Sequence, residues 1–207
     1  MKMEVMTEEK IYIENDSLII EGLLRKASPE LGVLICHPHP LMGGSMYNNV
    51  VEAIAEAFAA ENFTTLRFNF RGVGQSTGAY DEGRGEAQDI LAARRYLANS
   101  GWSKIYFAGY SFGAWVGTKV INLNNGMFTS LIFISPPNKY FDFDFTKLAV
   151  SLELIICGNQ DDFCDLAAVK KQIEKTKIKL ETISGADHFY LGKEKELTDI
   201  MRKHIIK

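Results

Sequence analysis

The chain has 207 residues, of which 46% are hydrophobic and 24% charged, and its formal net charge is −3. This balance is typical of a soluble globular protein and excludes a disordered or fibrous one. A slightly acidic chain offers no electrostatic reason to expect nucleic acid or membrane as a partner, so we expect a small-molecule ligand. Because no linker or repeat interrupts the sequence, we expect one domain over residues 1–207. We expect this domain to be a monomer or a small homo-oligomer.

The beginning of the chain and its cysteines predict a cellular compartment. Residues 1–10 include Glu4, Glu8 and Glu9, where a signal peptide would need a basic start followed by an apolar run. We therefore expect a cytoplasmic protein. The three cysteines include no CxxC pair, and Cys36 and Cys157 end apolar runs, which predicts buried free thiols rather than a disulfide framework.

Apolar residues alternate at the start of the chain and then recur in blocks. Residues 10–13 and 18–24 predict a β-hairpin around a turn at Asn15 and Asp16. Nearly continuous apolar runs, which suit a buried parallel sheet, follow at residues 31–36, 64–70, 104–108, 130–134, 152–157 and 178–183. Helical spacing of apolar residues occupies the intervals at residues 46–61, 85–99, 112–123 and 194–206. The order predicts a three-layer α/β domain with a mostly parallel sheet and an N-terminal antiparallel hairpin.

Residues 138–149 fit neither element. Their aromatic centre, residues 140–145, predicts a loop wall or a short lid, and the segment is too short for a separate cap domain. These aromatic side chains either plug the edge of the sheet or line a pocket.

A candidate nucleophile lies between the strand at residues 104–108 and the helix at residues 112–123. Gly109-Tyr-Ser-Phe-Gly113 matches the pattern G-x-S-x-G in the strand–turn–helix context that this pattern requires. A serine on such a sharp turn needs unusual backbone angles, and the flanking glycines let strand and helix approach closely. We predict Ser111 as the nucleophile and the backbone N–H of Phe112 as an oxyanion donor at the helix N-terminus.

A serine nucleophile needs a base, and the chain has four histidines. His188 lies in a turn-like segment just beyond the last predicted strand, where open α/β sheets hold their ligands. His204 falls within the final amphipathic helix and is predicted to be a surface residue. We therefore choose His188 as the base.

The acid that orients the base should follow another strand between Ser111 and His188. Asp161 and Asp162 both follow the apolar strand at residues 152–157, and Asp187 adjoins the histidine. Adjacent residues seldom face each other for a side-chain hydrogen bond. We predict Asp161, with Asp162 and Asp187 as alternatives.

A polar loop follows the strand at residues 31–36, in the sequence Cys36-His-Pro-His-Pro-Leu-Met-Gly-Gly44. This is where the architecture supplies a second oxyanion donor, and the two prolines of the loop have no N–H. We predict the backbone N–H of His39 as this second donor, with the N–H of Leu41 as the alternative. A metal site at His37-x-His39 lacks acidic or cysteine partners, so we expect no metal.

Together these motifs resemble the α/β-hydrolase superfamily, and more narrowly its small capless hydrolases related to dienelactone hydrolases and serine esterases. The resemblance covers most of the chain and implies Ser111, Asp161 and His188 as nucleophile, acid and base. It also implies an oxyanion hole made by Phe112 and the loop that begins at His37. Two departures stand out: the usual His-Gly of that loop is His-Pro here, and dienelactone hydrolases proper have cysteine in place of Ser111.

These features predict a serine hydrolase that cleaves small carboxylic esters or thioesters through an acyl-enzyme at Ser111, without a cofactor. Leu41, Tyr110 and Phe189 are the predicted substrate contacts, although packing in the core or wall is the alternative for Tyr110 and Phe189. Two other functions stay open. One is a serine peptidase or amidase acting on short peptides, and the other is a non-catalytic binding protein on a hydrolase fold.

Overall fold

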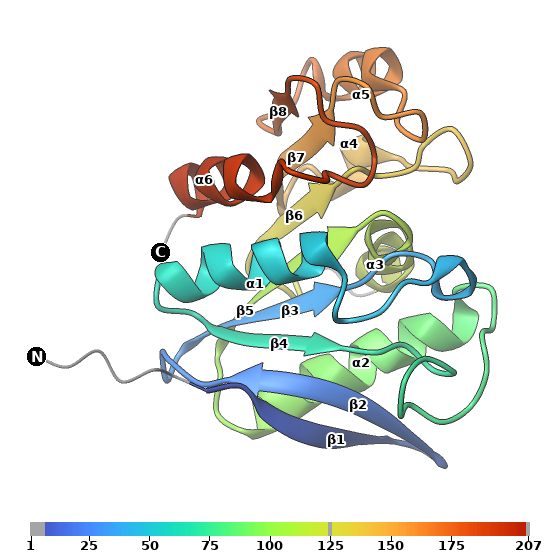
Figure 1. Ribbon diagram of the computed structural model, residues 1–207, viewed down its shortest axis with the longest axis vertical. Coiled ribbons are helices and arrows are strands. Elements are labelled where there is room, and N and C mark those ends of the chain that lie inside the picture. Colours follow the sequence, from blue (N-terminus) through green and yellow to red (C-terminus); the bar gives the residue numbers. More distant parts are fainter. Residues whose placement is uncertain (1–6, 124–125, 206–207) are drawn as a thin grey trace, which may run out of the picture.

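The computed structural model describes residues 7–123 and 126–205 and is built around one eight-stranded sheet (Figure 1). The strands are β1 (Glu9–Asn15), β2 (Leu18–Arg25), β3 (Leu31–Cys36), β4 (Thr64–Phe68), β5 (Lys104–Tyr110), β6 (Leu131–Ile134), β7 (Leu152–Gly158) and β8 (Lys179–Ile183). Their spatial order is β1-β2-β4-β3-β5-β6-β7-β8. The pairs β1–β2 and β2–β4 are antiparallel and the other pairs are parallel. This confirms the predicted N-terminal hairpin and mostly parallel sheet.

The N-terminal hairpin shows why its residues alternate. Asn15 pairs with Leu18 across the turn, and Asp16 takes a left-handed backbone conformation with φ of 54°. Ile11 and Ile13 are buried, whereas Tyr12 between them is exposed. One face of the hairpin therefore packs on the core and the other faces solvent.

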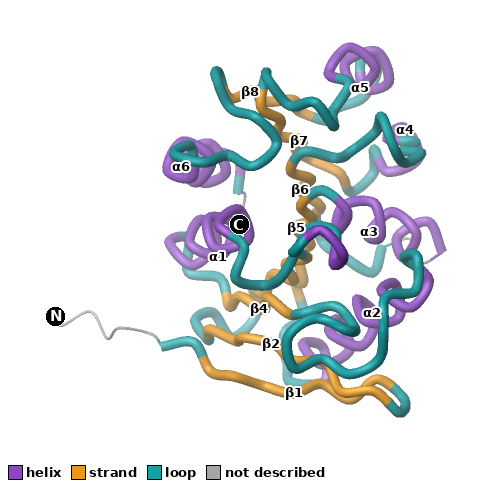
Figure 2. Tube along the Cα trace, turned by 45° about the vertical axis from the view of Figure 1, so that its right-hand side comes forward, coloured by secondary structure: helices purple, strands orange, loops and turns teal. Residues whose placement is uncertain are grey.

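Helices cover both faces of the sheet and complete three layers (Figure 2). On one face, α1 (Asn49–Ala60) lies beside α6 (Glu194–His204). The other face carries α2 (Arg84–Asn99), α3 (Phe112–Leu123), α4 (Phe145–Leu148) and α5 (Leu166–Ile173). A separate hydrophobic cluster fills each side of the sheet. The connection from β6 to β7 holds only the short α4, so no cap domain covers the sheet there.

None of the helices in the described residues is both long and apolar enough to cross a membrane. Several helices differ from the prediction, and the short α4 forms within residues 138–149, which were expected to be a loop. Helix α1 begins at Asn49 rather than residue 46, because the Asn48 side chain accepts a hydrogen bond from the backbone N–H of Val50 at 2.9 Å and caps the helix. Helix α5 was missed, although its cap Asp165 is a recognisable start signal. Helix α6 ends at His204, and Ile206, its predicted last residue, lies outside the described residues.

The aromatic segment after β6 divides between the two predicted roles. Phe143 and Phe145 are buried in the hydrophobic core, where they stack on each other with ring centroids 5.3 Å apart. Tyr140 and Phe141 instead line a cavity at the carboxyl end of the sheet. Both interpretations therefore hold, each for different residues of the segment.

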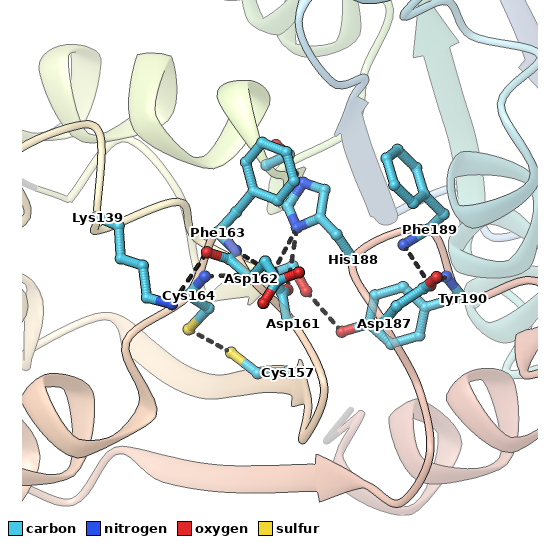
Figure 3. Close-up of polar contacts among 12 residues, drawn as sticks. Lys139, Cys157, Asp161, Asp162, Phe163, Cys164, Asp187, His188, Phe189 and Tyr190 are labelled. Atoms are coloured by element: carbon cyan, nitrogen blue, oxygen red, sulfur yellow. Dashed lines mark hydrogen bonds and ion pairs between the residues drawn. The ribbon is translucent and has the colours of Figure 1, made fainter.

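All three cysteines are free and buried, as predicted for Cys36 and Cys157. The sulfur atoms of Cys157 and Cys164 lie 3.1 Å apart at the end of β7 (Figure 3). The contact with Cys164, together with burial, raises the pKa of the Cys157 thiol.

Candidate active site

Ser111 occupies a sharp turn between the end of β5 and the start of α3. Its backbone φ of 54° is strained for a residue with a side chain, a feature that clusters at functional sites. A Cβ atom on Gly109 would lie 2.6 Å from the Cα of Ala114, and one on Gly113 would lie 2.6 Å from the carbonyl oxygen of Cys36. Strand and helix can therefore pack this closely only because both positions are glycine.

His188 lies within hydrogen-bond distance of both Ser111 and Asp161, and the three residues stand at the carboxyl ends of β8, β5 and β7. The Nε2 atom of His188 is 2.9 Å from the Oγ atom of Ser111. The Nδ1 atom of His188 is 3.0 Å from each carboxylate oxygen of Asp161 (Figure 3). All three side chains are buried, although they are polar. The structure thus brings together the three residues that the sequence nominated from separate loops.

The loop after β7 holds the Asp161 carboxylate toward His188. Its Oδ1 atom accepts hydrogen bonds from the backbone N–H groups of Phe163 at 2.8 Å and Cys164 at 3.2 Å. Burial opposes ionisation of this carboxyl, but the hydrogen bond from His188 and further donors outweigh it and lower the pKa of Asp161. The group is therefore a carboxylate at neutral pH and can stabilise a positive charge on the imidazole.

The two alternative acids are engaged elsewhere (Figure 3). The Asp187 carboxylate accepts hydrogen bonds from the backbone N–H groups of Phe189 at 2.9 Å and Tyr190 at 3.1 Å, which stabilise the turn after His188. Asp162 borders a different, polar cavity, and its backbone carbonyl accepts a hydrogen bond from Lys139 at 3.0 Å. Asp161 alone of the three nominated acids contacts the histidine.

Aromatic rings enclose the His188 imidazole. The Phe163 ring stacks on it with centroids 4.3 Å apart, and Tyr110 lies 5.5 Å away. The hydroxyl of Tyr110 also donates a hydrogen bond to the backbone carbonyl of His188 at 2.8 Å. Packing and hydrogen bonding therefore restrict both the ring plane and the backbone of His188.

The two residues predicted as oxyanion donors, Phe112 and His39, border the same cavity as Ser111. Phe112 is the first residue of α3, so its N–H has no acceptor within the helix. The His39 ring lies 4.7 Å from the Phe112 ring, and both residues border the same cavity. The Pro38 carbonyl accepts a hydrogen bond from the His37 ring. Because the peptide bond between Pro38 and His39 is trans, the His39 N–H points in the direction opposite to this carbonyl, away from the His37 ring.

His37 has a role that sequence reasoning missed. Its Nε2 atom accepts a hydrogen bond from the backbone N–H of Phe70 at 3.0 Å, so Nδ1 carries the proton and donates it to the Pro38 carbonyl at 2.6 Å. Burial lowers the pKa of His37 to about 4, which keeps the ring neutral. Both ring nitrogens serve the fold, so the ring braces the loop and offers no ligand to a metal. The signal available in the sequence was its position directly after the apolar run of residues 31–36.

A cavity of about 440 Å³ opens at Ser111 and His188. Its walls are mainly apolar and come from the loops after β3, β6 and β7, with Pro38, Met42, Pro137, Tyr140, Phe141 and Phe163. Tyr110 and Phe189, two of the predicted substrate contacts, line it as well.

The third predicted substrate contact, Leu41, lies outside the lining of the cavity. It is 72% exposed and does not border the cavity, whereas its neighbour Met42 does. Pro40–Met42 form a 3₁₀ turn, in which successive side chains point about 120° apart. The turn therefore directs Leu41 away from the cavity and places Met42, not Leu41, along its lining.

Comparisons with known proteins agree with this architecture. A family described as an alpha/beta hydrolase domain matches residues 33–205. An uncharacterized protein of Rickettsia prowazekii is 34% identical in an alignment 211 positions long that covers 95% of this chain and 88% of that protein.

Solved structures extend the comparison. An α/β serine hydrolase homologue from Coxiella burnetii is 34% identical, covers 98% of this chain and 100% of its own, and superposes with a TM-score of 0.86. A lidless member of the α/β serine hydrolases from Xanthomonas campestris is 27% identical, covers 98% of this chain and 95% of its own, and has a TM-score of 0.85.

Proposed function

The chain belongs to the α/β-hydrolase family, and from this premise we propose that it is a serine hydrolase that cleaves small carboxylic esters or thioesters. The observation that carries the proposal is the continuous hydrogen-bonded chain from Ser111 through His188 to Asp161, with distances of 2.9 and 3.0 Å. This geometry supports an attack by Ser111 on an acyl carbon at the wall of an apolar cavity.

In the first half of the proposed reaction, the Oγ atom of Ser111 attacks the carbonyl carbon while the Nε2 atom of His188 takes its proton. The Asp161 carboxylate stabilises the imidazolium that forms and keeps the proton of the neutral ring on Nδ1. His188 then passes the proton to the leaving alcohol or thiol, and Ser111 keeps the acyl group.

The negative oxygen of the tetrahedral intermediate needs hydrogen-bond donors. The N–H of Phe112 at the α3 N-terminus and the N–H of His39 are the proposed pair, supported by the position of both residues at the cavity beside Ser111. The helix dipole adds a partial positive charge at Phe112.

In the second half, a water molecule attacks the acyl-enzyme and gives its proton to His188. The histidine then protonates the Oγ atom of Ser111, and the carboxylic acid leaves. The same residues therefore serve both halves, and the attacking water supplies the proton that restores the Ser111 hydroxyl.

The experiment that tests this function compares an ester with its amide. We expect purified protein to hydrolyse p-nitrophenyl butyrate with a burst of about one nitrophenolate per active site, the signature of an acyl-enzyme. Butyryl p-nitroanilide should react at least about 10³-fold more slowly. Preferred hydrolysis of the anilide would favour the amidase alternative, and a folded protein inert toward both would favour the binding-protein alternative.

A further inference from the structure

The chemistry of the cavity walls narrows the class of substrate, an inference that rests on the proposed esterase function. Of the described residues that line the cavity, none is Lys, Arg, Asp or Glu. Two charged residues close to this lining have partners of their own. Glu86, which interacts with His39, accepts hydrogen bonds from the backbone N–H groups of Asp81 and Gly83, and Lys139, next to Tyr140 in the chain, donates to the Asp162 carbonyl. A charged group on the substrate would therefore lose water without gaining a partner.

Contacts with neighbouring aromatic rings fix the wall formed by Phe141 and Phe163. The Phe141 ring stacks on Trp115 with centroids 4.2 Å apart and an interplanar angle of 28°. The Phe163 ring stacks on His188, as described above, and also contacts Tyr140 at 5.4 Å. Rings fixed in this way offer a preformed apolar surface. A substrate that fits this surface therefore binds with little loss of side-chain conformational entropy.

Apolar surface continues from the cavity to its mouth. Met42, Tyr140 and Phe189 line the cavity and are still more than half exposed to solvent. Large exposed apolar side chains gathered at one opening are typical of binding surfaces. The volume of about 440 Å³ also exceeds what an acetyl ester needs, since pockets of this size hold drug-sized molecules.

We infer that the substrate is an uncharged ester whose acyl group is apolar and longer than acetyl, packed against Phe141, Phe163 and Met42. Each added methylene that the cavity buries should raise kcat/KM about fourfold, the equivalent of about 0.8 kcal/mol. A carboxylate at the end of the same acyl chain should lower kcat/KM at least about 100-fold.

A pair of matched substrates tests the inference. p-Nitrophenyl pentanoate and mono-p-nitrophenyl glutarate have five-carbon acyl chains and differ in a terminal methyl group or carboxylate. We expect wild-type protein to prefer the pentanoate at least about 100-fold and to prefer butyrate over acetate. Equal rates on pentanoate and glutarate, or a maximum at acetate, would overturn the inference.

Arginine substitutions in the wall should shift the substrate preference toward the charged ester. Phe141→Arg should raise the ratio of glutarate to pentanoate kcat/KM at least about 30-fold, whereas the uncharged control Phe141→Gln should leave that ratio within about threefold. Met42→Arg, at a position that is 70% exposed in the folded protein, provides a second test in the same direction. Unchanged ratios in both arginine variants would count against this wall as the acyl site.

The outcomes separate the two proposals. A folded wild type that turns over none of these esters would remove the esterase function and the inference together. Turnover with no preference for an uncharged or longer acyl chain would remove the inference alone.

Discussion

The hydroxyl of Tyr110, the residue before the nucleophile, donates a hydrogen bond to the backbone carbonyl of His188, 2.8 Å away and 78 positions later in the chain. Burial raises the pKa of this hydroxyl, so it keeps its proton and remains a donor. Tyr110 thus ties the nucleophile turn to the loop that carries the base, and it acts as a positioning residue.

Replacing Tyr110 with Phe should remove this tie and leave a buried carbonyl without its donor. We expect kcat to fall about 3- to 10-fold with little change in KM, and the free energy of unfolding to fall by about 1–3 kcal/mol. Urea unfolding and steady-state kinetics measure the two effects. Tyr12→Phe, on the exposed face of β1, is the matched control; an equal loss of activity there would argue against a local role for Tyr110.

Asp161→Asn tests the acid. The Asn side chain can still accept hydrogen bonds from Phe163 and Cys164, but its amide favours the wrong tautomer of His188. We expect kcat/KM on p-nitrophenyl butyrate to fall about 10³- to 10⁴-fold. Asp162→Asn, which removes the neighbouring charge, should change it by less than about threefold. Similar losses in both variants would contradict the assignment.

The backbone of His39 allows a test of its N–H alone. Its φ of −57° and ψ of 123° suit proline, which has no N–H, and the Pro40 that follows favours the same region. His39→Pro should therefore lower kcat about 10²- to 10³-fold, as loss of one oxyanion donor does. His39→Ala loses the same side chain but keeps the N–H, so it should retain activity within about fivefold. If both variants behave alike, the donor lies elsewhere.

His37 predicts a pH dependence of stability. Its folded pKa of about 4 lies below the unfolded value of about 6.5, so the unfolded chain binds the proton first as the pH falls. The free energy of unfolding should therefore decrease between about pH 6.5 and 4, with up to about 3 kcal/mol from this residue. His37→Gln should be less stable at pH 7, and its deficit should shrink by pH 4.5. Parallel pH profiles of wild type and variant would contradict this account.

Much of the architecture was predictable because its signals are local. Buried parallel strands need continuous apolar runs, and helices on the sheet need apolar residues at helical spacing. Ser111 stood out because its turn requires flanking glycines, and Asp161 and His188 because they follow strands whose carboxyl ends meet at one edge. The structure places these three side chains together as the sequence indicated.

The parts that escaped prediction depend on contacts between distant segments or on short turns. The brace at His37 requires the backbone of Phe70, 33 positions away. The choice between Leu41 and Met42 depends on the rotation of one 3₁₀ turn, and α5 spans only eight residues. In residues 140–145, the sequence pattern does not say which rings enter the core and which face the cavity.

The central claim is that Ser111 is the nucleophile, and covalent labelling tests it most directly. Wild-type protein treated with a fluorophosphonate should gain the mass of one phosphonyl group, and peptide mapping should place that group on Ser111, while folded Ser111→Ala should gain none. A folded wild type that takes up no label, or a label that persists in Ser111→Ala, would contradict the account.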